Sequence, residues 1–114
     1  MKFFLNGGTS KAVTHLIGST TTYRVQFTDD DGIAMNISSG TIEVLFYSTI
    51  ERTTIAKTIT VTPDASLGAY GYGTFQILPA ESTLTLGNTY YLWGKTTIST
   101  VVTIGSAPCS MLIK

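Results

Sequence analysis

The sequence predicts an all-β protein built as an antiparallel sandwich of two sheets. Threonine, valine, isoleucine and tyrosine are prominent throughout, and these residues suit a pleated, half-buried surface. Large apolar side chains occupy every second position at residues 23–27 and 42–46, which is the period of a strand with one face in a core. No window keeps the apolar period of a helix. Turn signals recur about every 8 to 12 residues and leave about seven short strands, as a two-sheet sandwich requires.

The segment 84–90 defines the sandwich more closely. Leu84, Gly87 and Tyr90 follow one another at three-residue intervals, the pattern of a tyrosine corner that leads into a strand. Gly87 permits a tight bend where the chain crosses between sheets, and the tyrosine hydroxyl is expected to bond a backbone group that otherwise lacks a partner. This structural corner favours an immunoglobulin-like β-sandwich.

Turn signals also place the remaining strands. A turn from Pro63 to Gly68, a longer connection ending at Gly87 and a short turn near Ser99 divide the second half of the chain. We expect strands at 54–62, 69–77, 88–98 and 100–105, a weaker one at 12–17, and a tail at 110–114 that adds an edge. In this interpretation residues 1–11, with their glycines, form a flexible N-terminal arm, and residues 12–114 form the domain.

Length and composition favour one domain with its own core. The chain has 114 residues, of which 43% are apolar, enough for a core without metal or disulfide bridges. The one cysteine, Cys109, cannot form an internal disulfide, which fits a protein folded in a reducing cytosol. The apolar start ends at Asn6, too early for a signal peptide, and no stretch approaches the roughly 20 apolar residues that span a bilayer.

The charge balance argues against highly charged partners. Only 12% of the residues are charged, with seven basic and seven acidic side chains, so phosphate backbones and anionic membranes attract the chain little. We therefore expect neither a nucleic acid nor a membrane as a partner. A surface with so little charge is poorly protected against association, so part of it is expected to contact another protein.

The alternation of side chains along two strands defines a candidate interface. If Tyr90 points into the core, its neighbours in the sequence point away from it. The expected inward set is Ile42, Val44, Phe46, Tyr90 and Leu92. The two strands are neighbours in an immunoglobulin-like sheet, so four outward side chains are expected to form one exposed cluster: Leu45, Tyr47, Tyr91 and Trp93.

Such a cluster offers a few kcal/mol on association, at roughly 25 cal/mol per Å² of buried apolar surface. A neighbouring subunit, or the arm or tail of the same chain, could cover it, and the sequence leaves both open. If a subunit covers it, replacing Trp93 with Ala is expected to impair assembly and leave the fold nearly intact.

Candidate catalytic residues do not form a recognisable motif. A nucleophile needs a base within hydrogen-bond reach, yet the only histidine, His15, and Cys109 lie at opposite ends of the sequence. We expect no enzymatic activity and no cofactor, with His15 an ordinary strand residue.

Two loops superficially suggest ligand sites. The run Asp29–Asp31 before Gly32 is reminiscent of a calcium loop, but that register puts Phe27 and Ser38 where the first and last ligands belong. A turn whose aspartates bond their own backbone is the favoured interpretation, and a weak cation site is the alternative.

The glycines Gly68, Gly71 and Gly73 suggest a phosphate loop. Gln76 occupies the third glycine position and no helix follows. A bulge or a close approach of two chain segments is the favoured interpretation.

Aromatic residues raise one alternative function. Tyr70, Tyr72, Tyr91 and Trp93 could provide stacking faces for a sugar, as in a carbohydrate-binding or cell-surface adhesion module. Nothing in the sequence places polar partners around them.

Three segments resemble a known family of virion domains. After Phe27 an acidic turn ends at Gly32, and Asn36, Ile37 and Gly40 precede an alternating strand. This stretch, with residues 73–77 and the corner at 84–90, resembles the N-terminal immunoglobulin-like domain of tailed-phage baseplate upper proteins. The likeness covers about residues 20–105. Family members are often one domain of a longer protein, and they usually carry aspartate where this chain has Asn36.

The resemblance implies a non-enzymatic structural protein of a tailed-phage virion. Its partners would be other capsid, tail or baseplate subunits, and it would be present in many copies or as a homo-oligomer. A capsid decoration or cement protein, or a small tail or baseplate component, would suit such a domain. Its location would be the virion, after synthesis in the host cytoplasm.

Overall fold

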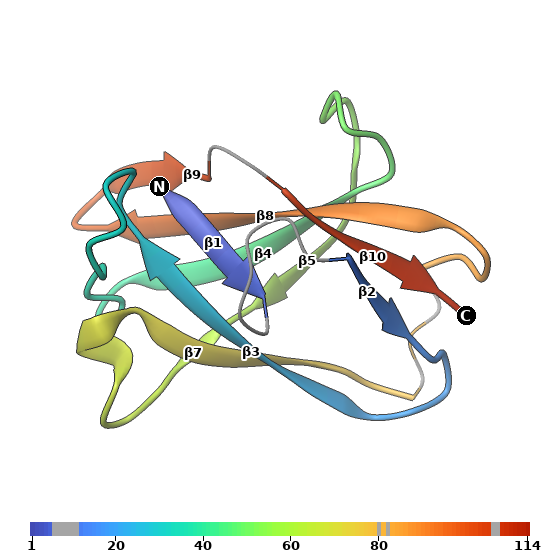
Figure 1. The fold of residues 1–114 in the computed structure, drawn as a ribbon, viewed down its shortest axis with the longest axis horizontal. Coiled ribbons are helices and arrows are strands. Elements are labelled where there is room, and N and C mark those ends of the chain that lie inside the picture. The colour runs from blue at the N-terminus through green and yellow to red at the C-terminus, as the bar shows by residue number, and fades with distance from the viewer. Residues whose placement is uncertain (6–11, 80, 82, 106–107) are drawn as a thin grey trace.

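The computed structural model describes residues 1–5, 12–79, 81, 83–105 and 108–114. Two β-sheets pack face to face around one core, and the only helix among these residues is a single 3₁₀ turn, η1 (Gly68–Tyr70) (Figure 1). The all-β class predicted from the sequence is confirmed. The described chain contains ten strands, however, where the sequence led us to expect about seven.

The first sheet has four strands in the order β1-β3-β7-β6, and all its pairs are antiparallel. The strands are β1 (Lys2–Leu5), β3 (Thr21–Thr28), β6 (Thr62–Pro63) and β7 (Tyr72–Ile77). Pro63 has no N–H group to donate, and β6 pairs with only two residues of β7. Residues 75–77 of β7 therefore lack a neighbouring strand on that side within the described chain.

The second sheet has six strands in the order β2-β10-β8-β4-β5, with β9 also paired to β8. The strands are β2 (Ala12–His15), β4 (Thr41–Tyr47), β5 (Ile55–Thr60), β8 (Thr89–Ile98), β9 (Val101–Ile104) and β10 (Cys109–Ile113). One side of β8 pairs with β4, and its other side pairs with β10 along one half and with β9 along the other. The β2–β10 pair is parallel, whereas the other pairs in this sheet are antiparallel.

The two sheets enclose the core that the alternation predicts. The inner faces of β4 and β8 carry the five residues expected to point inward, and all five lie in one buried cluster with residues of the four-stranded sheet. Phe27 and Phe3 pack with ring centroids 5.4 Å apart. In Figure 1 the strands β3 and β7 of the four-stranded sheet run below β8 and β10 of the six-stranded sheet.

Gly94 of β8 shows how closely the two sheets approach. A Cβ atom at this position would lie 2.4 Å from the ring of Phe27, so only glycine leaves room for the ring. The backbone of the six-stranded sheet therefore serves as part of the wall around Phe27.

The predicted N-terminal arm is wrong for residues 1–5. These residues form β1, which pairs with β3, and Phe3 and Leu5 are fully buried. Two apolar side chains at alternate positions gain more by filling the core than by remaining in solvent. Residues 6–11, the rest of the expected arm, lie outside the described residues.

The prediction that the tail adds an edge is also wrong. β10 lies inside the six-stranded sheet, between β2 and β8, and Met111 and Ile113 are fully buried. The sequence could not show this because β2 joins the sheet through a parallel pair with β10 that spans most of the chain.

The tyrosine corner has the predicted geometry. The hydroxyl of Tyr90 accepts a hydrogen bond of 2.8 Å from the backbone N–H of Thr85, and the Tyr90 side chain is buried. Gly87 has a φ of 87°, in the left-handed region that favours glycine, and Leu84 is buried. The corner fixes the point where the chain enters β8.

Candidate functional site

The four predicted interface residues lie together on the outer face of the six-stranded sheet. Leu45 pairs with Trp93 and Tyr47 pairs with Tyr91 in the β4–β8 register. They form a small cluster separate from the main core, and we call these four residues the outer aromatic cluster. The predicted face and the predicted neighbourhood of the two strands are therefore confirmed.

The predicted exposure of this cluster is wrong for Leu45, Tyr47 and Trp93, and Tyr91 is half-buried. Leu45 and Trp93 are each 3% exposed and Tyr47 is 9% exposed. The edge of Tyr47 meets Trp93 with ring centroids 5.5 Å apart, and the guanidinium carbon of Arg52 lies 5.0 Å from the centre of the Trp93 ring. Arg52 belongs to the β4–β5 connection, so a loop that the sequence analysis did not consider helps to cover the cluster. The cluster thus offers little apolar surface to a partner.

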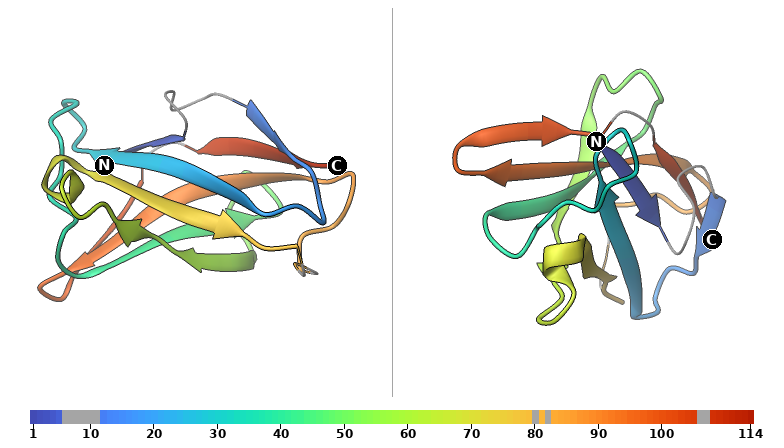
Figure 2. Two further views of the ribbon diagram at one scale, coloured as in Figure 1. Left: turned by 90° about the horizontal axis from the view of Figure 1, so that it is seen from below. Right: turned by 60° about the vertical axis from the view of Figure 1, so that its left-hand side comes forward.

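A different part of this sheet exposes apolar side chains. Val101 is 63% exposed, Val102 is 55% exposed and Ile104 is 43% exposed, and all three lie on β9. A two-residue turn, Ser99 and Thr100, joins β9 to β8 with both φ angles positive, the conformation of a tight hairpin. Figure 2 (right) shows β9 as the outermost strand at this end of the sheet.

Sequence reasoning placed this strand but missed its exposure. Three of the four residues of this strand, Val101, Val102 and Ile104, are apolar, and they fall on both of its faces. Apolar side chains on both faces usually indicate a strand that is covered on both faces. That signal could have identified β9 as a strand with apolar side chains on both faces.

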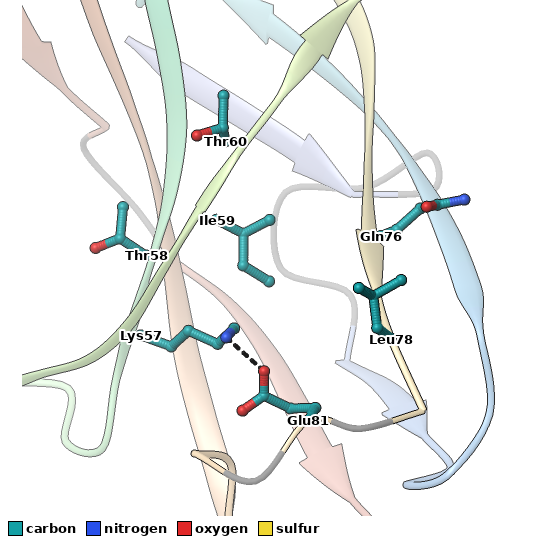
Figure 3. A pocket seen from close by; sticks show the side chains of 7 residues that line it. All are labelled: Lys57, Thr58, Ile59, Thr60, Gln76, Leu78 and Glu81. Atoms are coloured by element: carbon teal, nitrogen blue, oxygen red, sulfur yellow. Dashed lines mark ion pairs between the residues drawn. The ribbon is translucent and has the colours of Figure 1, made fainter.

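A hollow of about 360 Å³ lies on the open side of the sandwich, between β5 and the unpaired end of β7. Ile59 and Leu78 face each other across it, and an ion pair between Lys57 and Glu81 stands at one end (Figure 3). Threonine and glutamine side chains complete the lining. The hollow sits between two strand edges.

The carboxylate of Glu81 is fully engaged in structural contacts. One oxygen pairs with Lys57, and the other accepts hydrogen bonds from the backbone N–H groups of Thr83 and Leu84. Burial acts to raise the pKa of Glu81, but the bonds from Lys57 and Thr83 outweigh it and hold the pKa below its usual value. These contacts attach the loop that leads to the tyrosine corner to β5.

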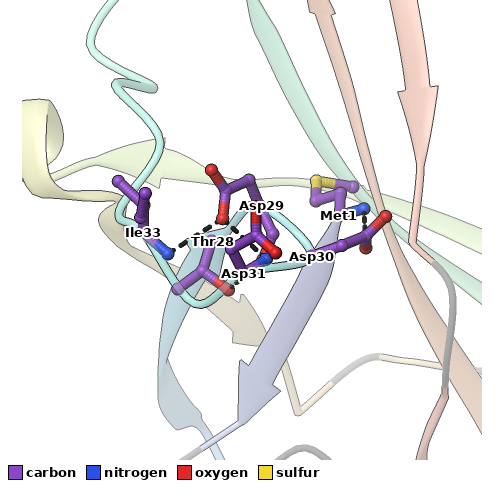
Figure 4. A network of polar contacts seen from close by, with 6 residues as sticks. All are labelled: Met1, Thr28, Asp29, Asp30, Asp31 and Ile33. Atoms are coloured by element: carbon purple, nitrogen blue, oxygen red, sulfur yellow. Dashed lines mark hydrogen bonds and ion pairs between the residues drawn. The ribbon is translucent and has the colours of Figure 1, made fainter.

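The acidic turn is the self-bonded turn that the sequence favoured. One carboxylate oxygen of Asp29 accepts hydrogen bonds of 2.9 Å from the backbone N–H groups of Asp31 and Ile33 (Figure 4). Asp30 forms an ion pair of 2.6 Å with the amino group of Met1. Gly32 completes the turn with a φ of 85°.

The glycine-rich segment is a place of close chain approach, as expected. Gly71 ends η1 with a φ of 86°, and a Cβ atom there would lie 2.2 Å from the carbonyl oxygen of Phe27. The carbonyl oxygen of Gly71 accepts a hydrogen bond from the N–H of Phe27, and this bond connects η1 to β3. Gly71 thus has a structural role in the packing of η1 against β3.

His15 and Cys109 occupy separate buried environments. Nδ1 of His15 lies 2.9 Å from the hydroxyl of Tyr23, and burial lowers the pKa of the imidazole, although the charge of Glu81 acts to raise it. The Cys109 thiol lies 3.7 Å from the carbonyl oxygen of Phe3, and burial raises its pKa to about 11. His15 and Cys109 therefore do not form one catalytic group.

The four aromatic residues considered for sugar stacking do not form one platform. Tyr72 lies on the outer face of the four-stranded sheet, where the guanidinium of Arg24 stacks over its ring at 4.5 Å, whereas Tyr91 and Trp93 lie on the opposite outer face. Tyr70 is exposed at the end of η1. The sandwich therefore separates the two pairs.

No group of three or more potential metal ligands from His, Cys, Asp and Glu lies together in the described part of the chain. No helix among the described residues is long and apolar enough to cross a membrane. The sequence matches no model of a known protein family, and it matches no curated protein.

Trp93 provides a test of the outer aromatic cluster. Replacing Trp93 with Ala removes a side chain that is 3% exposed, so we expect the free energy of unfolding to fall by about 2–4 kcal/mol in urea denaturation. This outcome replaces the nearly intact fold that the sequence led us to expect. Tyr72→Ala is the matched control, because it removes a half-buried ring that also lies under an arginine, and we expect a loss of about 1 kcal/mol. A loss of about 1 kcal/mol or less for Trp93→Ala would contradict this role of the cluster.

His15 provides a test by pH. Its folded-state pKa lies below the ordinary value of 6.5, so the unfolded chain binds the proton first, and stability is lost as the pH falls below about 6.5. The free energy of unfolding should fall by at most about 1.4 kcal/mol per pH unit in the range between this value and the folded-state pKa. A His15→Gln variant should show a flatter profile between about pH 7.5 and pH 5.5. Parallel profiles for the variant and the wild type would contradict the lowered pKa of His15 in the folded state.

Proposed function

We propose that this chain is a non-enzymatic structural protein of a tailed-phage virion, with an immunoglobulin-like sandwich that binds other virion subunits. The strand order supports the fold part of this proposal. β1, β3, β7 and β6 follow the order of strands A, B, E and D of an immunoglobulin domain, and β10, β8, β4 and β5 follow G, F, C and C′. The tyrosine corner at the start of β8 stands at the expected entrance to strand F.

The observation that carries the binding role is the apolar surface of β9. Three large aliphatic side chains at least 43% exposed on one edge strand form a surface suited to association rather than to solvent. The balanced, sparse charge of the chain adds little repulsion between subunits. The virion context rests on the sequence resemblance at residues 27–44, 73–77 and 84–90.

A particle experiment tests the virion context. Particles are purified from the bacterial strain that carries the gene, heads and tails are separated, and each fraction is quantified by mass spectrometry. We expect the chain in one fraction at a fixed ratio to the major subunit of that fraction. An abundant cytosolic host protein serves as the contamination control. A chain that follows this host protein, or is absent from both fractions, would overturn the proposal.

A further inference from the structure

β9 differs from the other edge strands of the described chain. Native sheets protect their edges with charge, proline, bulges or very short strands, because an unpaired edge is a template for another chain. β6 has two residues and contains Pro63. β5 carries Lys57 on its inner face and a register shift beside Tyr47, while β1 carries Lys2. β2 is short and has a buried His15 at its end.

β9 carries no charge and no proline, and its apolar side chains point to both faces of the sheet. Val102 and Ile104 share the outer face with Lys95, and Val101 lies on the other face. β2 covers the outer edge of β10 but its pairing begins at Ser110, so it does not extend along β9. The sequence of β9 therefore suits a strand with neighbours on both sides, while the described chain supplies a neighbour on one side only.

We propose that β9 pairs antiparallel with β9 of a second copy of this chain, joining the two six-stranded sheets into one continuous sheet. This inference rests on the proposed role as a multi-copy structural subunit and names one of its contacts.

Symmetry limits which residues would meet. Antiparallel strands related by a two-fold axis place side chains of the same face opposite each other. Val102 would therefore lie opposite Val102 or opposite Ile104 of the second copy, and both choices form an apolar cross-strand pair. A strand that is apolar on both faces complements itself in either register.

The charge pattern permits a second copy, and the small apolar area sets the expected strength of the contact. The nearest charged side chain on the outer face, Lys95, is paired with Glu43 at 3.9 Å. Three strand spacings would separate the two Lys95 strands, roughly 14 Å, which exceeds the screening length of about 8 Å at physiological salt. The exposed parts of three aliphatic side chains supply only a fraction of the about 800 Å² per partner typical of stable complexes. The contact should be weak in solution and strengthened by the high local concentration in an assembly.

Sedimentation velocity of the purified chain tests the proposal. We expect the weight-average sedimentation coefficient to rise from the monomer toward the dimer value between about 10 μM and 1 mM. The rise should persist in about 0.5 M NaCl, because apolar burial and backbone pairing are little affected by screening. Hydrogen exchange should show β9 amides gaining protection as the concentration increases.

Two matched variants locate the contact. Val102→Lys places a charge on the exposed outer face of β9 and should reduce the association constant at least about tenfold. Ile55→Lys makes the same change on the exposed edge strand β5 and should leave the constant within about twofold. Thermal unfolding of both variants at low concentration checks that each is folded.

A chain that stays monomeric up to about 1 mM would overturn the proposal, as would loss of association in Ile55→Lys alone. Incorporation into particles without dimerisation in solution would leave the proposed virion role standing and reject this contact. Dimerisation in solution without incorporation into particles would support this contact and reject the proposed virion role.

Discussion

The register of β8 against β4 determines which residues are inside this protein and which are outside. These two strands lie in the middle of the six-stranded sheet and pair over seven residues, from Thr41 with Thr97 to Tyr47 with Tyr91. A shift of one residue would turn every side chain of β8 to the opposite face. The tyrosine corner sets where β8 begins, because the bond from Thr85 to the Tyr90 hydroxyl fixes the direction of this side chain into the core.

This register gives the sheet two apolar layers rather than one. The inner layer packs against the four-stranded sheet, and the outer aromatic cluster packs within its own surface under Arg52. Stacking of a guanidinium on an indole face lets a charged side chain cover an apolar surface while its polar atoms remain in water. The stability contributed by this second layer thus comes from within the chain, and three exposed aliphatic side chains lie instead at the edge, on β9.

The strand edges connect the fold to the proposed function. A sandwich of this size must leave several edges open, and here they differ in how each is protected. The ion pair between Lys57 and Glu81 occupies the open side near β5, and Pro63 limits β6. Among the described edge strands, β9 carries three aliphatic side chains that are at least 43% exposed, and it has neither charge nor proline. A weak contact of this kind is suited to a subunit held in many copies, where each contact adds to the others.

Local patterns in the sequence predicted most of the strands and their faces. The alternation at 42–46 and the spacing of Leu84, Gly87 and Tyr90 are local signals, and they gave the inner face of β4 and the start of β8 correctly. What failed depended on contacts between distant segments. Three such contacts cannot be predicted from the residues next to them in the sequence. They are the pairing of β1 with β3, the insertion of β10 between β2 and β8, and the position of Arg52 over Trp93. Burial of an outward side chain depends on such contacts as well as on strand parity.

Native-state hydrogen exchange at a concentration where the chain is monomeric tests the central role of β8 and β4 most directly. Residue-resolved NMR can measure the free energy of opening for each amide. The account predicts that the amides joining β4 and β8 open only with global unfolding, while those of β2 and β9 open at lower free energy. Amides in the β4–β8 pair that exchange as readily as those of β2 would contradict it.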